Sequence, residues 1–111
     1  MRNDILYLRD IVEAARAVSR FVADLDEARF VADDLVRSAV LHKLTVIGEA
    51  AARVSAELRH ANSGIPWADI VGFRNIAVHA YFAVDWRLVW NAATLDAPAL
   101  ERAIGALLET R

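Results

Sequence analysis

The sequence predicts an all-α protein, a four- to five-helix up-down bundle, on three observations. Apolar residues recur at spacings of three and four along most of the chain, which is the period of an amphipathic helix. Sustained alternation of apolar and polar residues is absent, and so are the Asn-Gly and Asp-Gly pairs of hairpin turns. Hydrophobic residues make up 57% of the chain, enough to bury a modest core.

The first predicted helix begins near Asn3, a residue suited to an N-cap. Its apolar stripe consists of Ile5, Leu8, Val12, Ala15, Val18 and Val22. A polar bridge over 23–29 then leads to a second, longer helix. The stripe of that helix keeps the same spacing over several turns and consists of Val36, Val40, Leu44, Ile47, Ala51, Val54 and Leu58.

Residues 62–66, Asn-Ser-Gly-Ile-Pro, form the clearest break in the chain, and a third helix over 67–82 is predicted to follow them. Asp85 is predicted to cap a fourth helix. Asp96 and Pro98 are predicted to end that helix before a last one begins. The whole chain, 1–111, is expected to form a single domain.

The charge and the cysteine content exclude several functions. A net charge of −2 counts against a protein that coats nucleic acid, but it leaves room for a small catalytic site that contacts one or two phosphates. The chain has no cysteine, which removes disulfides and thiolate nucleophiles and suits a reducing cytoplasm. It also lacks the His-x-His and His-Glu-x-x-His patterns of metal sites, so we expect neither a metal nor a cofactor.

No segment has the length of a membrane span. The longest apolar stretch, 76–84, is interrupted by His79 and Tyr81. The first residues, Met-Arg-Asn-Asp, do not resemble a signal peptide. We therefore expect a soluble, cytoplasmic protein without a membrane partner.

Four hydrogen-bonding side chains share one half of the third predicted helix, which is otherwise apolar: Arg74, Asn75, His79 and Tyr81. Measured from Arg74, Asn75 lies at about 100°, His79 at about 140° and Tyr81 at about −20° around the helix axis. Asn75 and His79 are an i, i+4 pair whose side chains should touch. An ordinary solvated face would carry Lys and Glu instead, so the pattern indicates a site.

The pattern Arg-Asn-x-x-x-His-x-Tyr at 74–81 resembles the signature of the HepT-like family, within the HEPN superfamily. The resemblance extends over almost the whole chain, through the opening run 2–11, Ile-Gly-Glu-Ala-Ala at 47–51, Ile-Pro-Trp at 65–67 and Tyr-Phe-Ala-Val-Asp at 81–85. Two positions depart from it. Ala80 stands where the family often has glycine, and Ile76 where a basic residue is common, which bears on RNA affinity but leaves the chemical groups present.

The resemblance implies a HEPN-like bundle that acts as a metal-independent endoribonuclease toxin. It implies that Arg74, Asn75 and His79 are catalytic, with RNA as the substrate. It further implies a homodimer through the third helix and an MntA-type nucleotidyltransferase antitoxin that adenylylates Tyr81.

The residue types fit this chemistry. Imidazole titrates near neutral pH, so His79 can accept and donate the protons that move when a 2′-hydroxyl attacks its own phosphorus. The planar guanidinium of Arg74 matches phosphate oxygens, and Asn75 can orient the imidazole or bind a phosphate oxygen. One site histidine per chain is awkward for a reaction that needs both an acid and a base, and a two-fold dimer resolves this. AMP on Tyr81 would bring bulk and negative charge to the site.

The same residues also have structural interpretations. His79 can be a core histidine bonded to a backbone carbonyl, Arg74 a solvated helix arginine, and Tyr81 a half-buried tyrosine with a solvated hydroxyl. Glu49 follows Gly48, which would permit a close helix crossing. Glu49 is therefore a candidate for an acidic partner that orients Arg74, although a solvated glutamate is the simpler expectation.

Two other functions stay open at this point. A catalytically silent HEPN scaffold would bind a nucleotidyltransferase partner or a nucleotide, and a plain helical dimerisation domain would bind neither. Only an endoribonuclease requires Arg74, Asn75 and His79 all to be polar and to converge. The sequence therefore favours the ribonuclease toxin and leaves the RNA that it cuts unidentified.

Overall fold

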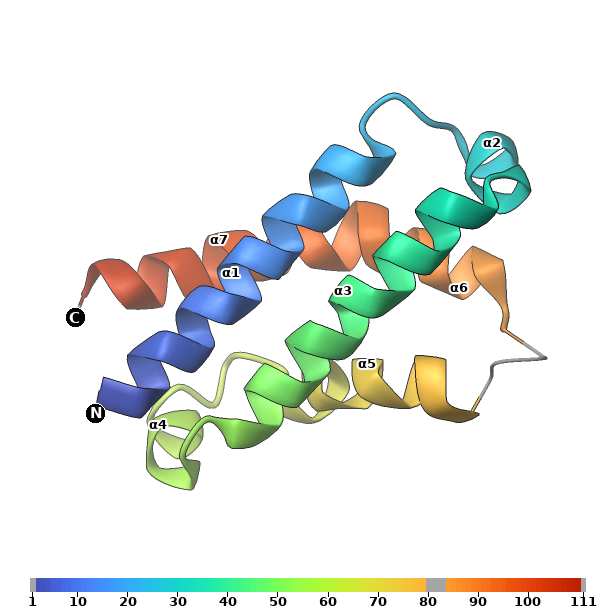
Figure 1. The fold of residues 1–111 in the computed structure, drawn as a ribbon. Coiled ribbons are helices and arrows are strands. Elements are labelled where there is room, and N and C mark those ends of the chain that lie inside the picture. The colour runs from blue at the N-terminus through green and yellow to red at the C-terminus, as the bar shows by residue number, and fades with distance from the viewer. Residues whose placement is uncertain (1, 80–83, 111) are drawn as a thin grey trace.

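Four long helical segments cross the molecule in alternating directions (Figure 1). The computed structural model describes residues 2–79 and 84–110, and the side chains of 3–76 and 84–110. The long segments are α1 (Arg2–Val22), α3 (Asp34–Arg53), α5 (Trp67–His79) and a final run of α6 (Trp86–Asn91), η1 (Ala92–Asp96) and α7 (Ala97–Glu109). Two short helices, α2 (Glu27–Ala32) and α4 (Ala56–Ala61), lie in the connections. The described residues form helices and no strand, so the all-α prediction is confirmed.

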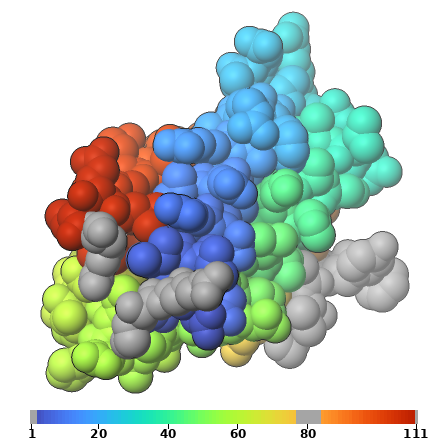
Figure 2. Space-filling view, turned by 60° about the vertical axis from the view of Figure 1, so that its left-hand side comes forward, coloured from blue at the N-terminus to red at the C-terminus, as the bar shows by residue number. Residues whose placement is uncertain are grey.

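The antiparallel pair α1 and α3 forms the centre of the bundle. α7 packs on α1 and α5 packs on α3, so α5 lies at one edge. In a space-filling view the blue surface of α1 lies between the red surface of α7 and the green surface of α3 (Figure 2). Aliphatic side chains with no exposure hold these helices together: Leu8, Ile11, Val18, Val40, Leu44, Ile47 and Ile104. Burying each contributes roughly 1.5–3 kcal/mol.

Helix α2 overlaps the end of what the sequence suggested was a polar bridge over 23–29, so that prediction is wrong in part. Asp26 caps α2, because its carboxylate accepts a hydrogen bond of 2.8 Å from the backbone N–H of Arg29. Phe30 of α2 is fully buried, with its ring 6.2 Å from that of Trp86 and 5.3 Å from that of Trp90. These aromatic contacts attach the α2 turn to α6.

The second predicted helix is divided in two, which corrects the single stripe that ran to Leu58. α3 ends at Arg53, Val54 is extended, and Ser55 caps α4 by accepting from the backbone N–H of Leu58 at 3.1 Å. The buried carboxylate of Asp4, in α1, accepts from both the backbone N–H and the hydroxyl of Ser55, at 2.8 and 2.7 Å. These hydrogen bonds replace the helical bond that a continuous helix would make there.

The break predicted at Asp96 and Pro98 is also absent, because the chain stays helical from Trp86 to Glu109. Asp96 makes no capping hydrogen bond through its side chain. Pro98 has no N–H, and its ring would crowd a carbonyl one turn earlier in a regular helix. The wider π-helical turn η1 lies directly before it and changes this spacing, so the helix continues. None of the described helices is both long and apolar enough to cross a lipid bilayer.

Candidate active site

Helix α5 crosses α3 closely at one glycine, and this crossing places Arg74. A Cβ atom on Gly48 would lie 2.5 Å from the backbone nitrogen of Arg74 and 3.0 Å from its Cβ. It would also lie 3.0 Å from the carbonyl oxygen of Val71. Because backbone atoms cannot yield as a flexible side chain can, any larger residue at this position would push α5 away from α3. The absence of a side chain at Gly48 therefore fixes the position of Arg74.

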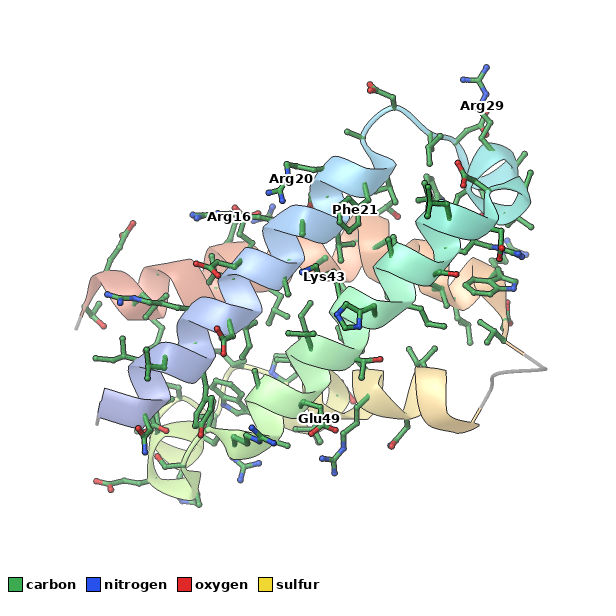
Figure 3. All side chains as sticks on the ribbon, in the orientation of Figure 1. Arg16, Arg20, Phe21, Arg29, Lys43 and Glu49 are labelled. Atoms are coloured by element: carbon green, nitrogen blue, oxygen red, sulfur yellow. The ribbon has the colours of Figure 1, made fainter. Side chains whose placement is uncertain are left out.

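Glu49 and Arg74 meet beside this crossing. A guanidinium nitrogen of Arg74 lies 3.8 Å from a carboxylate oxygen of Glu49. The two side chains are 40% and 50% exposed, so the pair contributes at most about 1 kcal/mol to stability. Glu49 lies on α3, where Figure 3 labels it. A guanidinium has five N–H donors, so this contact can orient Arg74 and still leave donors for a phosphate.

The other two predicted catalytic residues follow Arg74 on α5. Asn75 is exposed, and among the described residues its amide has no hydrogen-bond partner. His79 is the last residue of α5 and lies one turn beyond Asn75. Its backbone is about 7.5 Å further along the helix axis than that of Arg74. The His79 side chain lies outside the described residues, so the predicted contact with Asn75 stays a prediction.

Tyr81, the predicted adenylylation site, lies outside the described residues altogether. What the structure brings together is therefore Gly48, Glu49 and Arg74, with Asn75 beside them on the exposed side of α5.

Glu49 also lines a hollow of about 230 Å³, which was not predicted from the sequence. It lies between α1 and α3 and is lined by Tyr7, Asp10, Thr45, Val46, Glu49, Ala50 and Arg53. The i, i+4 spacing of Glu49 and Arg53 places both on one face of α3 and is visible in the sequence. Tyr7 and Asp10 come from another helix, and only the packing of α1 on α3 brings them there.

A second, apolar groove of about 400 Å³ lies between α5 and the η1–α7 segment. Its lining residues are Ile65, Pro66, Asp69, Ile70, Phe73, Asp96, Ala99, Leu100 and Ala103. Burial raises the pKa of Asp96 above its ordinary value, and the carboxylate of Asp69 nearby raises this pKa further. The groove lies apart from the Glu49–Arg74 pair, whose residues do not line it.

Among the side chains of residues 3–76 and 84–110, no three of His, Asp or Glu gather closely enough to hold a metal ion.

Comparison with known proteins identifies the family. The model of the "Ribonuclease HepT-like" family matches residues 11–107. "Putative RNase MJ1380" of Methanocaldococcus jannaschii is 35% identical over 98 residues, which cover 88% of this chain and 90% of that protein. "Putative RNase TTE0752" of Caldanaerobacter subterraneus is 30% identical over 98% of this chain and 97% of its own length. "Probable ribonuclease HepT" of Thermococcus cleftensis is 33% identical over 86% of each chain.

No solved structure matches the chain significantly. The family match covers most of the helical bundle, including the Gly48 crossing, Glu49 and the polar face of α5. The chain therefore belongs to the HepT-like ribonuclease family.

Proposed function

We propose that the chain is a metal-independent endoribonuclease, the toxin of a HepT/MntA-type toxin–antitoxin system. The placement of Arg74 carries this proposal. Its backbone is fixed by the crossing at Gly48, and its half-exposed guanidinium is held on one side by Glu49. A permanently charged planar group in this position can receive a phosphate without reorganising. Membership of a ribonuclease family supports RNA as the phosphate-bearing substrate.

In the proposed reaction the 2′-hydroxyl of RNA attacks the adjacent phosphorus. A bond forms between O2′ and phosphorus, and the bond from phosphorus to O5′ of the next nucleotide breaks. One imidazole takes the proton from the 2′-hydroxyl, and a protonated imidazole delivers a proton to the leaving O5′. His79 supplies these groups, because an imidazole can both accept and donate a proton.

Arg74 and Asn75 act on the phosphate during this step. Negative charge grows on the non-bridging oxygens as the fifth bond forms, and the guanidinium of Arg74 stabilises it through two parallel N–H donors. Asn75, exposed beside Arg74, binds a phosphate oxygen or orients the imidazole of His79. The products are a 2′,3′-cyclic phosphate and a 5′-hydroxyl.

A homodimer through α5 would supply the acid and the base together. α5 lies at one edge of the bundle and packs chiefly on α3, so among the described residues its opposite side is left for a second copy. A two-fold axis beside α5 would bring two copies of His79 and Arg74 near one scissile phosphate. One imidazole can then be neutral while the other is protonated.

The purified chain, free of any partner and of AMP, should cleave RNA in the presence of EDTA and leave 2′,3′-cyclic phosphate ends. His79→Ala should abolish cleavage with helicity unchanged, because the ring transfers protons. Arg74→Lys should lower kcat by about 10²-fold or more, the usual effect of losing a charge-stabilising donor, because an ammonium cannot form the paired contact. Gel analysis of end groups, with circular dichroism of each variant, measures both effects.

Arg102→Lys, an exposed arginine on α7, is the matched control and should cut like the wild type. Strict dependence of cleavage on added Mg²⁺ or Mn²⁺ would overturn the metal-independent mechanism. Activity near wild type in His79→Ala or Arg74→Lys would show that the substituted residue has a structural role and not a catalytic one.

A further inference from the structure

Two hollows adjoin on the α1–α3 face, because they have two lining residues in common. The first is the hollow of about 230 Å³ beside Glu49, and the second has a volume of about 530 Å³. Both are lined by Asp10 and Val46. The second hollow continues along the two helices and is otherwise lined by Glu13, Ala14, Arg16, Ala17, Arg20 and Lys43. We call the combined feature the α1–α3 groove.

The near end of the α1–α3 groove touches the proposed phosphate site. Glu49 lines this end and is also the residue whose carboxylate lies 3.8 Å from Arg74. The ring of Tyr7 and the aliphatic side chains of Val46 and Ala50 line the same hollow. An aromatic ring with aliphatic neighbours offers a flat, sequence-tolerant surface for a nucleobase.

The far end of the groove carries unpaired positive charge. Arg16 is engaged by Glu101, with 3.2 Å between its Nε and the carboxylate oxygen. Arg20 and Lys43 also line this end, and among the described residues neither forms an ion pair. Figure 3 shows Arg20 on α1 and Lys43 on α3, with Glu49 further along α3. Lys43 precedes Glu49 by six residues, which is about 9 Å along the helix.

We propose that the α1–α3 groove binds the RNA strand next to the scissile phosphate. Two neighbouring backbone phosphates contact Arg20 and Lys43, one each, and the base nearest to the cut stacks on Tyr7. This inference rests on the proposed function and extends it, because it assigns a binding track for single-stranded RNA beyond Arg74. Positive charge along a groove with an interposed aromatic ring is how proteins bind a single strand without reading its sequence.

Carboxylates in the groove limit where a phosphate can lie. Asp10 and Glu13 line it together with the cations, so the middle of the groove repels phosphate. The Arg20–Lys43 end brings together two cations that have no carboxylate partner among the described residues, and Arg53 is a further such cation in the hollow beside Glu49. Removing a carboxylate should therefore strengthen RNA binding, which is the opposite of what removing a cation should do.

The first test measures binding separately from cleavage. Fluorescence anisotropy of a labelled single-stranded RNA is recorded against salt concentration, in a His79→Ala background that keeps the RNA intact. Each phosphate contact to single-stranded RNA contributes about 0.7 to the slope of log K against log salt, so Arg20→Ala with Lys43→Ala should lower the slope by about 1.4. The same relation gives a loss of roughly 25-fold in affinity at about 0.1 M salt.

The matched control is Arg29→Ala with Arg102→Ala, which removes the same charge from exposed sites on α2 and α7. This control should leave the slope within about 0.3 of the wild type, since it removes no phosphate contact. Glu13→Gln should tighten binding. An unchanged slope in the Arg20/Lys43 variant, or an equal fall in the control, would contradict RNA binding in the α1–α3 groove. Weaker RNA binding by Glu13→Gln would contradict it as well.

The second test uses substrate length to separate the groove from the active site. The Arg20/Lys43 variant should raise KM for a longer oligonucleotide about tenfold or more, with kcat unchanged, because it removes about two phosphate contacts. KM for a dinucleotide should not change, since a dinucleotide has no further phosphate to reach Arg20 and Lys43. Equal effects on both substrates would overturn the groove. A normal binding response from a wild type that cuts no RNA would support the groove and contradict the proposed function.

Discussion

Arg74 illustrates what single residues contribute and what the sequence can reveal about them. Its unusual place on an apolar helix marks it as a candidate site residue from the sequence alone. Gly48 and Glu49 could be suspected as its neighbours only because glycine permits a close crossing, and the structure places both against it. Tyr7, Arg20 and Lys43 carried no such signal, since each is an ordinary residue within its own helix.

The prediction for a single residue concerns Tyr81. Incubation with a cognate nucleotidyltransferase and ATP should add one AMP to Tyr81 and suppress RNA cleavage. The added phosphate repels RNA and competes for the guanidinium of Arg74. Tyr81→Phe should resist modification and still cut, because the hydroxyl has no step in the proposed reaction. Intact-mass spectrometry, together with the cleavage assay, measures both outcomes.

The chain has two tyrosines, so Tyr7→Phe is the natural control and should still accept AMP. If AMP is also added to the Tyr81→Phe protein, the residue that the nucleotidyltransferase modifies is not Tyr81. Loss of cleavage in the unmodified Tyr81→Phe protein would make the tyrosine catalytic.

The helices were predictable from apolar spacing, and their ends were less so. The spacing carries on in phase through Val54 and Leu58, both of which are buried, so it does not reveal that α3 stops at Arg53. The stop depends on Asp4, which lies 51 positions before Ser55 and bonds to it. Pro98 likewise suggested a helix boundary, because proline normally interrupts a helix. The π-helical turn η1 accommodates it, and the sequence carries no simple signal for that turn.

The prediction for the packing of the helices concerns the α3–α5 crossing. Gly48→Ala should lower the free energy of unfolding by roughly 1–3 kcal/mol, because its Cβ would lie 2.5 Å from the backbone nitrogen of Arg74. It should also reduce cleavage, since α5 must move away from α3. Urea denaturation and the cleavage assay measure the two effects.

Gly72→Ala is the matched control on α5 itself, where a Cβ would meet nothing within 4 Å. It should be neutral or stabilising by up to about 1 kcal/mol, because alanine favours a helix more than glycine does. A Gly48→Ala protein as stable as Gly72→Ala would show that the crossing is not tight.

At the scale of the whole molecule, the class of fold was predictable and the neighbours of each helix were not. Amphipathic stripes show that helices pack. However, α1 packs on both α3 and α7, and α3 packs on both α1 and α5, and the stripes do not reveal which helix contacts which face. The structure places α5 at the edge of the bundle, and the open side of α5 is what the homodimer requires.

The homodimer is the prediction at this scale. Light scattering at micromolar concentration should give twice the chain mass, about 25 kDa from 12.3 kDa per chain, or a larger assembly that contains the dimer. A monomer under conditions where the protein cleaves RNA would rule out a paired-histidine mechanism. The Arg20/Lys43 variant should dimerise normally, because its substitutions lie in the α1–α3 groove, which no described residue of α5 lines.

The crossing at Gly48 also bears on how the proposed toxin would lose its activity by mutation. If cells were selected for survival while they express this protein, escape substitutions should accumulate at the polar face of α5 and equally at position 48. The codon for Gly48 would behave in that selection like a codon for a catalytic residue, although its product has no side chain to touch RNA. Nearly every missense change there would be recovered, whereas Gly64 and Gly105, whose added Cβ atoms meet nothing, would be almost silent.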